Sequence, residues 1–148
     1  MALIDKITEN VIKVPLESTT KTDVLRELLD ILVAAGAVND ETAAYNALLE
    51  RESKGSTGLE AGIAIPHAKT DAVESIQIAI GISPEGIDFQ ALDGQPSKVF
   101  FLILAAPDQS GPHVEALSEI ARMTRSAAFM RALVGSLNAR EVLELIRE

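Results

Sequence analysis

The chain has 148 residues, of which 47% are hydrophobic and 24% are charged, a balance typical of one ordinary folded domain. It contains no cysteine, which excludes a disulfide framework, a cysteine-rich zinc site and a cysteine nucleophile. The 13 basic and 22 acidic residues give a net charge of −9, so nucleic acid and an anionic membrane surface are poor partners. The charge favours a basic protein partner, although it would also serve solubility alone.

The apolar segments are too short for insertion into a membrane. No stretch approaches the ~20 apolar residues that span a bilayer. The N-terminal segment MALIDKITENVIK carries charges throughout and lacks the apolar core of a signal peptide. We therefore expect a complete, cytoplasmic protein with no direct membrane insertion.

Strand-like and helical patterns alternate along the chain. Residues 99–106 (VFFLILAA) form a continuous apolar run, which is typical of a strand buried on both faces. Thr20 and Asp23 have the spacing of a helix-capping pair. Asn138 and Glu141 have the same spacing. In chain order, the predicted elements are a strand over 11–14, helices over 20–36 and 39–51, a glycine-rich loop over 54–62, a short apolar run over 63–65, a strand over 76–82, a turn-rich connection over 84–94, a strand over 99–106, and helices over 113–125, 126–134 and 138–146.

This order of elements predicts a single α/β domain over residues 1–148. The sequence has no internal repeat, and no linker rich in proline, glycine or serine is long enough to separate two domains. Strands and helices that alternate in one chain pack as layers around a shared core. We therefore expect a sandwich in which a mixed β-sheet carries helices on both faces.

The two histidines, His67 and His113, are the strongest candidates for chemistry. Each lies where a strand-like run gives way to a loop or a helix, and α/β proteins build sites at such sheet edges. Pro66 stiffens the backbone before His67, and a helix that begins near His113 offers free N–H groups to an anion. A neutral imidazole can attack phosphorus, a second imidazole can bind an equatorial oxygen, and Arg51 can grip phosphate oxygens. These three residues are candidates for phosphoryl transfer.

Plainer interpretations of the same residues stay open at this point. A histidine at a strand end is often only hydrogen-bonded or at the surface, and Arg51 at a helix end also complements the helix dipole. Other kinds of site are disfavoured. The loop over 54–62 lacks the spacing of a phosphate-binding P-loop. Neither H-x-x-x-H nor H-E-x-x-H is present to bind a metal, and no G-x-S-x-G elbow carries a nucleophilic serine.

Three motifs, taken together with their spacing, favour phosphoryl transfer over the other interpretations of these residues. Arg51-Glu52 comes ahead of Ser56-Thr57-Gly58, residues 58–69 read GLEAGIAIPHAK, and Pro107-Asp108 precedes His113-Val114-Glu115-Ala116-Leu117. Together they closely resemble the active-site signatures of the fructose/mannitol-type (type 2) enzyme IIA domains of the bacterial phosphoenolpyruvate-dependent sugar phosphotransferase system. The resemblance covers essentially the whole chain. The family's mixed α/β sandwich agrees with the fold expected from the pattern.

The resemblance implies a role for each candidate residue. His67 is similar to the phosphoryl acceptor, which takes the group from the phosphohistidine of the carrier protein HPr and passes it to a cysteine of an enzyme IIB domain. His113 is similar to the supporting histidine that orients the phosphoryl group, and Arg51 to the residue that helps neutralise its charge. Thr57 is a weaker candidate for a hydroxyl contact, with loop capping as its plainer role. No metal, ATP or other cofactor is implied.

The resemblance leaves two functions open. The first is a sugar-transport relay that serves a fructose- or mannitol-like permease. The second is a regulator similar to the nitrogen-related enzyme IIA, in which phosphorylation of the histidine controls partner proteins without sugar transport. The site residues are shared by both, and neither the sugar nor the oligomeric state can be read from the sequence. In either case His67 must be reached by two different proteins, so we expect it at the floor of a shallow apolar depression.

Overall fold

The computed structural model describes residues 7–147 of the chain. Strands and helices are mixed through these residues, as predicted, but they are grouped, with two helices before the four central strands and three helices after them. In chain order the elements are η2 (Glu9–Val11), β1 (Ile12–Lys13), α1 (Lys21–Ala34), α2 (Glu41–Ser53), β2 (Ile63–Ala64), β3 (His67–Lys69), β4 (Gln77–Ile87), β5 (Ser97–Ala105), α3 (Ser110–Thr124), α4 (Ala127–Val134) and α5 (Ala139–Arg147).

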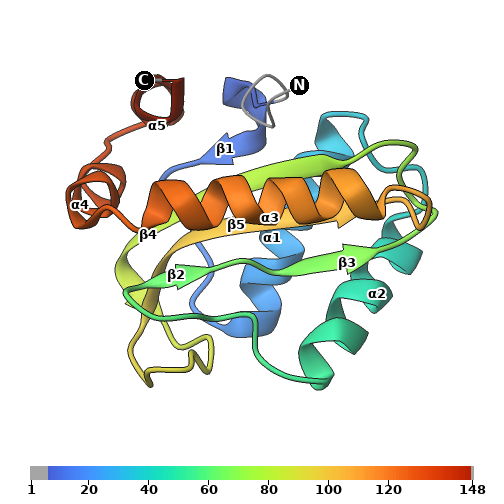
Figure 1. Cartoon of the computed structure of the whole chain (residues 1–148), viewed down its shortest axis with the longest axis horizontal. Helices are drawn as coiled ribbons and strands as arrows, with labels where there is room; N and C mark the ends of the chain where they lie inside the picture. Colours follow the sequence, from blue (N-terminus) through green and yellow to red (C-terminus); the bar gives the residue numbers. More distant parts are fainter. Residues whose placement is uncertain (1–6, 148) are drawn as a thin grey trace.

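The strands form one mixed sheet around β5. On one side β5 pairs antiparallel with β4, and on the other side it pairs parallel with both β2 and β3. β1 extends the sheet by pairing parallel with β4. β2 and β3 thus lie end to end along one strand, and the break between them falls immediately before His67 (Figure 1). The predicted mixed sheet is confirmed.

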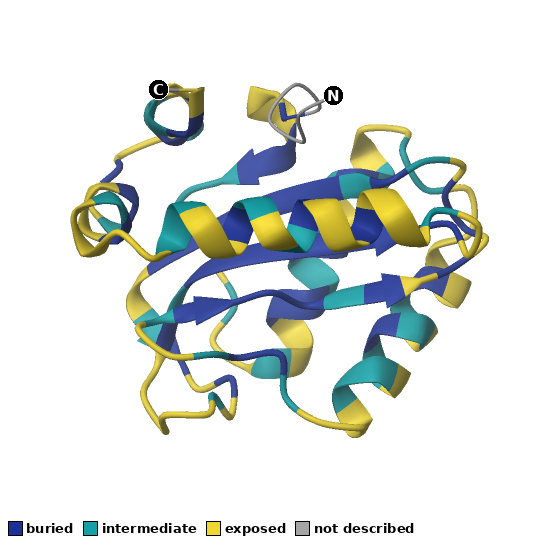
Figure 2. Ribbon diagram, in the orientation of Figure 1, coloured by how far each residue is buried: buried dark blue, intermediate teal, exposed yellow. Residues whose placement is uncertain are grey.

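Helices cover both faces of this sheet, as predicted. In the view of Figure 1, α3 crosses in front of β4 and β5, whereas α1 lies behind them. Figure 2 shows that the strands are largely buried and that α3 alternates between buried and exposed positions. Burial of these apolar faces is the main favourable contribution to folding. Within residues 7–147, no helix has the length and apolar character needed to cross a membrane.

Both predicted helix caps form. The Oγ1 of Thr20 accepts a hydrogen bond from the backbone N–H of Asp23 at 3.3 Å, at the start of α1. At the start of α5, Oδ1 of Asn138 accepts from the N–H of Glu141 at 3.0 Å. The Glu141 carboxylate in turn accepts from the N–H of Leu137, the residue before this cap, at 2.8 Å. The local sequence therefore fixes where these two helices begin.

The predicted turn over residues 84–94 is wrong in its first part, because β4 continues to Ile87. An irregularity between Ile82 and Ile87 accommodates Pro84, after which pairing with β5 resumes opposite Ser97. Gly86 has a φ of +87°, and a Cβ there would lie 2.6 Å from the side chain of Pro96. The strand tolerates the proline and glycine because its regular ladder is interrupted where they lie.

The start of α3 is also earlier than predicted. The helix begins at Ser110, whereas the pattern placed its start near His113. Pro112 lies inside the first turn, where backbone N–H groups have no partner within the helix. Its missing N–H therefore costs no hydrogen bond. The N–H of His113 donates to the carbonyl of Gln109 at 3.0 Å, so this histidine is already held by the first turn.

A partly buried carboxylate, that of Glu27, connects the segment after β1 to α1. The carboxylate of Glu27 accepts hydrogen bonds from the hydroxyl of Ser18 at 2.6 Å and from the N–H groups of Glu17 and Ser18. It also pairs with Lys13 at 2.9 Å. Burial alone would raise the pKa of Glu27, but these hydrogen bonds outweigh it and lower the pKa from 4.5 to about 2. The ionised form is therefore favoured by folding.

We expect Glu27→Gln to lower the free energy of unfolding at neutral pH by about 2 kcal/mol. This is less than the ~3.4 kcal/mol that the pKa shift alone would give, because the carboxylate is partly exposed to water, which screens its interactions. Because the folded-state pKa is depressed, the contribution is complete above pH 4.5 and declines as the pH falls toward 2. Urea unfolding of the wild type and of Glu27→Gln, each at pH 7 and at pH 3, measures this contribution to stability. A difference of equal size at the two pH values would contradict this assignment.

Candidate functional site

β3 presents His67 at the edge of the sheet. After β2, the chain leaves regular pairing at Ile65 and Pro66, and pairing with β5 resumes with His67 opposite Ile103. The carbonyl of Pro66 accepts a hydrogen bond from the N–H of Ile103 at 2.9 Å, which fixes the peptide just before the histidine. Because side chains alternate along a strand, His67 and Lys69 point to the same face of the sheet.

A backbone carbonyl sets the protonation of the His67 ring. Nδ1 of His67 lies 2.8 Å from the carbonyl oxygen of Ile65. A carbonyl oxygen only accepts hydrogen bonds, so Nδ1 carries the proton in this arrangement. The lone pair of the neutral ring is then on Nε2. His67 therefore offers one nucleophilic nitrogen in a defined direction.

His113 faces His67 from the first turn of α3. The two ring centroids are 5.2 Å apart and the rings are inclined by 73°. His113 is only 6% exposed. Its Nε2 is one of the few buried side-chain polar atoms in residues 7–147 that have no hydrogen-bond partner within the protein. This nitrogen is therefore available to bond to a group held at His67.

The site favours a neutral His113. Burial lowers the pKa of the His113 imidazole below its ordinary value of 6.5, and the nearby His67 and Lys69 lower it further. Lys69 itself is held in place because its Nζ lies 2.9 Å from Oγ of Ser110, the first residue of α3. One lysine thus ties the strand that carries His67 to the helix that carries His113.

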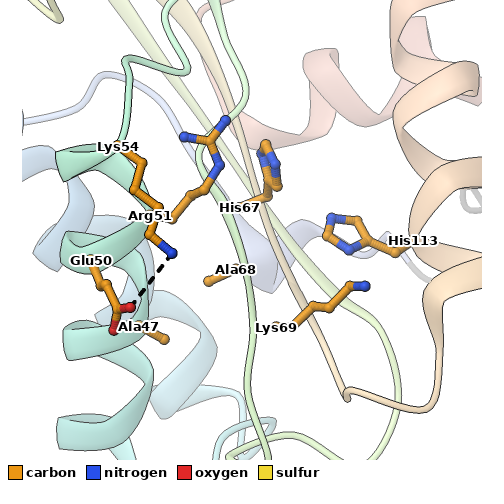
Figure 3. A pocket seen from close by; sticks show the side chains of 8 residues that line it. All are labelled: Ala47, Glu50, Arg51, Lys54, His67, Ala68, Lys69 and His113. Carbon is orange, nitrogen blue, oxygen red and sulfur yellow. Dashed lines mark ion pairs between the residues drawn. The ribbon is translucent and has the colours of Figure 1, made fainter.

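A basic cavity of about 360 Å³ opens between α2, β3 and α3 (Figure 3). Arg51 enters it from the last turn of α2, and its Nη1 donates to the carbonyl of Gly55 at 2.8 Å. Lys54 pairs with Glu50 at 3.7 Å. The lining residues are Ala47, Glu50, Arg51, Lys54, His67, Ala68, Lys69 and His113. Three cationic side chains therefore surround the two histidines of a protein whose net charge is −9.

An apolar groove of about 270 Å³ adjoins this cavity on the other side of His67. Arg51 and His67 line both hollows. The other groove residues are Ser56, Thr57, Leu59, Ile65, Leu117 and Ala121. The predicted apolar surround of His67 is thus present on one side only, since the opposite side is charged. Of the predicted site residues, the structure brings together His67, His113 and Arg51.

Thr57 lies in the wall of the groove, but its hydroxyl already has a partner. It donates to the carboxylate of Glu52, and the N–H of Thr57 donates to the same carboxylate at 3.1 Å. This geometry does not support the direct phosphate contact expected for Thr57. Lys69 and Glu52, which the sequence pattern did not mark as site residues, also lie at this site. Alternation along a strand that begins at His67 could have indicated Lys69.

Comparison with known proteins shows the family to which this chain belongs. The model of the family described as "Phosphoenolpyruvate-dependent sugar phosphotransferase system, EIIA 2" matches residues 5–148. The chain belongs to this EIIA type 2 family. The resemblance seen in the three sequence motifs is therefore confirmed, and EIIA domains are phosphotransfer components.

Two curated relatives are fructose-specific components. The chain is 40% identical to the "PTS system fructose-specific EIIA component" of Haloferax volcanii over 129 residues, which covers 87% of this chain and 84% of the relative. It is 36% identical to the "PTS system fructose-specific EIIABC component" of Bacillus subtilis over 148 residues. That match covers all of this EIIA chain but only 23% of the length of the Bacillus protein.

A solved structure carries a different title. "Nitrogen Regulatory Protein IIA-Ntr from Neisseria meningitidis" superposes with a TM-score of 0.89 at 26% identity, covering 97% of this EIIA chain and 98% of that one. The mixed α/β fold is therefore shared between transport-related and regulatory members. The fold and the family do not distinguish these two functions.

We expect His113 to titrate below pH 6.5 and Lys69→Met to raise its pKa, because the substitution removes one nearby positive charge. NMR titration of the His113 ring resonances measures both effects. Lys54→Met is the matched control, since Lys54 lines the same cavity but is paired with Glu50. Equal shifts in the two variants would show that Lys69 has no specific effect on His113.

Proposed function

We propose that His67 accepts a phosphoryl group from the phosphohistidine of an HPr-type carrier and passes it to a cysteine of an enzyme IIB domain. The observation that carries the proposal is the free Nε2 of His67, fixed by the bond from Nδ1 to Ile65 and facing His113 inside a basic cavity. Membership of the EIIA type 2 family supports the same chemistry. The protein acts in the cytoplasm as one domain over residues 1–148.

The transfer is a pair of displacements at phosphorus. The lone pair on Nε2 of His67 attacks the phosphorus atom of the donor, while the donor's P–N bond breaks and its electron pair returns to the donor ring. In the second step the thiolate of the IIB cysteine attacks the same phosphorus. The P–Nε2 bond then breaks and its electrons return to the His67 ring. Neither step needs a metal or a nucleotide.

The neighbouring side chains stabilise the group in transit. Nε2 of His113, in the tautomer that carries its proton there, donates to a phosphoryl oxygen. The guanidinium of Arg51 and the ammonium of Lys69 balance the negative charge on the phosphoryl oxygens. A neutral His113 suits this role because it donates a bond without adding further charge beside two cations. The direct Thr57 contact is left out of this proposal because that hydroxyl is bonded to Glu52.

The leading function is a transport relay for a fructose- or mannitol-type sugar. The similarity to two fructose-specific components supports it. The second candidate is a nitrogen-related regulator, which the match to the Neisseria structure supports. In that case the phosphorylation state of His67 controls binding to other proteins. Transfer onward to a IIB cysteine distinguishes the two, as does the presence of IIB and IIC permease genes beside the gene for this chain.

We expect incubation with phosphoenolpyruvate, enzyme I and HPr to add one acid-labile phosphoryl group to His67. Intact mass measurement and site mapping detect it. His67→Ala should remove all incorporation because it removes the nucleophile. No incorporation into the wild-type protein, with donors that phosphorylate a known EIIA domain, would refute the proposal.

We expect His113→Ala to slow phosphorylation of His67 without preventing folding, by about 100- to 1,000-fold if it removes one donor to the phosphoryl oxygens. Rapid-quench measurement of transfer from phospho-HPr and onward to a IIB domain gives both rates. Circular dichroism and thermal unfolding serve as the folding control. Normal rates in both directions would exclude a supporting role for His113.

A further inference from the structure

Glu52 is a buried carboxylate beside the site that no step of the transfer uses. Its side chain is 6% exposed. It accepts hydrogen bonds from the N–H of Thr57 at 3.1 Å and from the Thr57 hydroxyl. It also pairs with Nζ of Lys21, the first residue of α1, at 2.9 Å. Burying a carboxylate is costly, and an ion pair of this kind is weak evidence for stability alone. Stability alone therefore does not explain why Glu52 is buried beside the site.

A continuous series of hydrogen bonds leads from Glu52 to the ring of His67. Glu52 holds Thr57 at both its N–H and its hydroxyl. The carbonyl of Thr57 accepts from the N–H of Ile65 at 3.0 Å. The carbonyl of Ile65 accepts from Nδ1 of His67 at 2.8 Å. The carbonyl that selects the His67 tautomer therefore belongs to a residue whose own N–H is fixed by the loop that Glu52 anchors.

The same loop also touches Arg51. Arg51 immediately precedes Glu52 in the last turn of α2, and its Nη1 donates to the carbonyl of Gly55. Gly55 lies between the two ends of the turn that the Glu52–Thr57 bonds close. Displacement of this turn would therefore move the partner of Arg51 together with the carbonyl that orients His67.

We propose that Glu52 is a positioning residue, which keeps the proton of His67 on Nδ1 and the guanidinium of Arg51 at the cavity by anchoring the loop over residues 54–57. The kinetic part of this inference rests on the proposed phosphoryl transfer. Glu52 does not contact the ring of His67 and takes no proton in the reaction. It acts through Thr57 and Ile65.

Glu27 offers a matched control within the same chain. Like Glu52, it accepts a hydroxyl bond and pairs with a lysine, and it accepts bonds from two backbone N–H groups where Glu52 accepts one. It lines a different hollow, formed by α1 and the segment after β1. Loss of Glu27 should lower stability without changing the ring of His67. Any general effect of removing a buried carboxylate is therefore measured separately from the effect on the site.

The experiment compares Glu52→Gln and Glu52→Ala with Glu27→Gln and the wild type. ¹⁵N chemical shifts of the His67 ring, measured in the unphosphorylated protein at alkaline pH, report the tautomer. We expect both Glu52 variants to lose the single Nδ1–H tautomer and show averaged shifts for the two nitrogens. Transfer from phospho-HPr should slow by about 10- to 100-fold, mainly in kcat, because a misplaced nucleophile loses near-attack geometry. Glu27→Gln should keep the wild-type ring shifts and rate.

Thr57→Val provides a second, milder variant in case Glu52→Ala does not fold. It removes the hydroxyl bond and keeps the backbone N–H, so a smaller change in the same ring shifts is expected. Wild-type ring shifts in the folded Glu52→Gln and Thr57→Val proteins would overturn the proposal, as would transfer rates equal to that of Glu27→Gln. If the wild type itself takes no phosphoryl group, the proposed function fails, while the ring shifts still test the role of Glu52.

Discussion

The pairing of β3 with β5 is the constraint on which the site depends. β5 is the strand that every part of the sheet except β1 contacts directly. Its residues are buried almost throughout, so it cannot shift without disturbing the core. By pairing His67 with Ile103 it fixes both the height of the histidine along the sheet and the face from which the ring projects. α3, which follows β5 after a short connection, then returns across the front of the sheet (Figure 1), and its first turn brings His113 within ring contact of His67.

Electrostatics complement this mechanical arrangement. An acidic protein surrounds a small basic cavity, so an anionic group is attracted locally although the whole molecule is negative. Lys69 contributes in two ways, since it bonds to Ser110 and also disfavours a charged His113. Lys54 and Lys69 line only the basic cavity, whereas Arg51 and His67 line both this cavity and the adjoining apolar groove. In the proposed transfer, a macromolecular donor would meet positive charge for its phosphoryl group and an apolar surface for its side chains.

Local signals in the sequence predicted much of this fold. The caps at Thr20 and Asn138 depend on residues three positions apart, and β5 is marked by an unbroken apolar run. The extension of β4 to Ile87 could not be predicted in the same way, because it depends on pairing with a residue ten positions later across an irregular segment. A local reading therefore treats Pro84 as the end of the strand.

In the candidate site, too, local sequence signals predicted some features, whereas others depend on contacts made only in the folded chain. Motif spacing led to the pair of histidines and to Arg51, whose residue types carry recognisable chemistry. The partner of Thr57 did not follow from spacing, since its hydroxyl bonds to Glu52 only once the loop after α2 folds back on that helix. The tautomer of His67 likewise depends on where the carbonyl of Ile65 points, a backbone angle that residue identity does not determine.

The single free nitrogen of His67 has a consequence for turnover. Because Nδ1 is bonded to the backbone, the donor and the acceptor of the proposed transfer would both react at Nε2, and they cannot occupy it together. The exchange is then a ping-pong cycle in which each partner leaves before the other arrives. Residence time on this one surface limits the flux, so selection for speed disfavours tight binding to either partner. A narrow contact around His67, adequate for alignment and quick to separate, is the form of recognition that such a cycle requires.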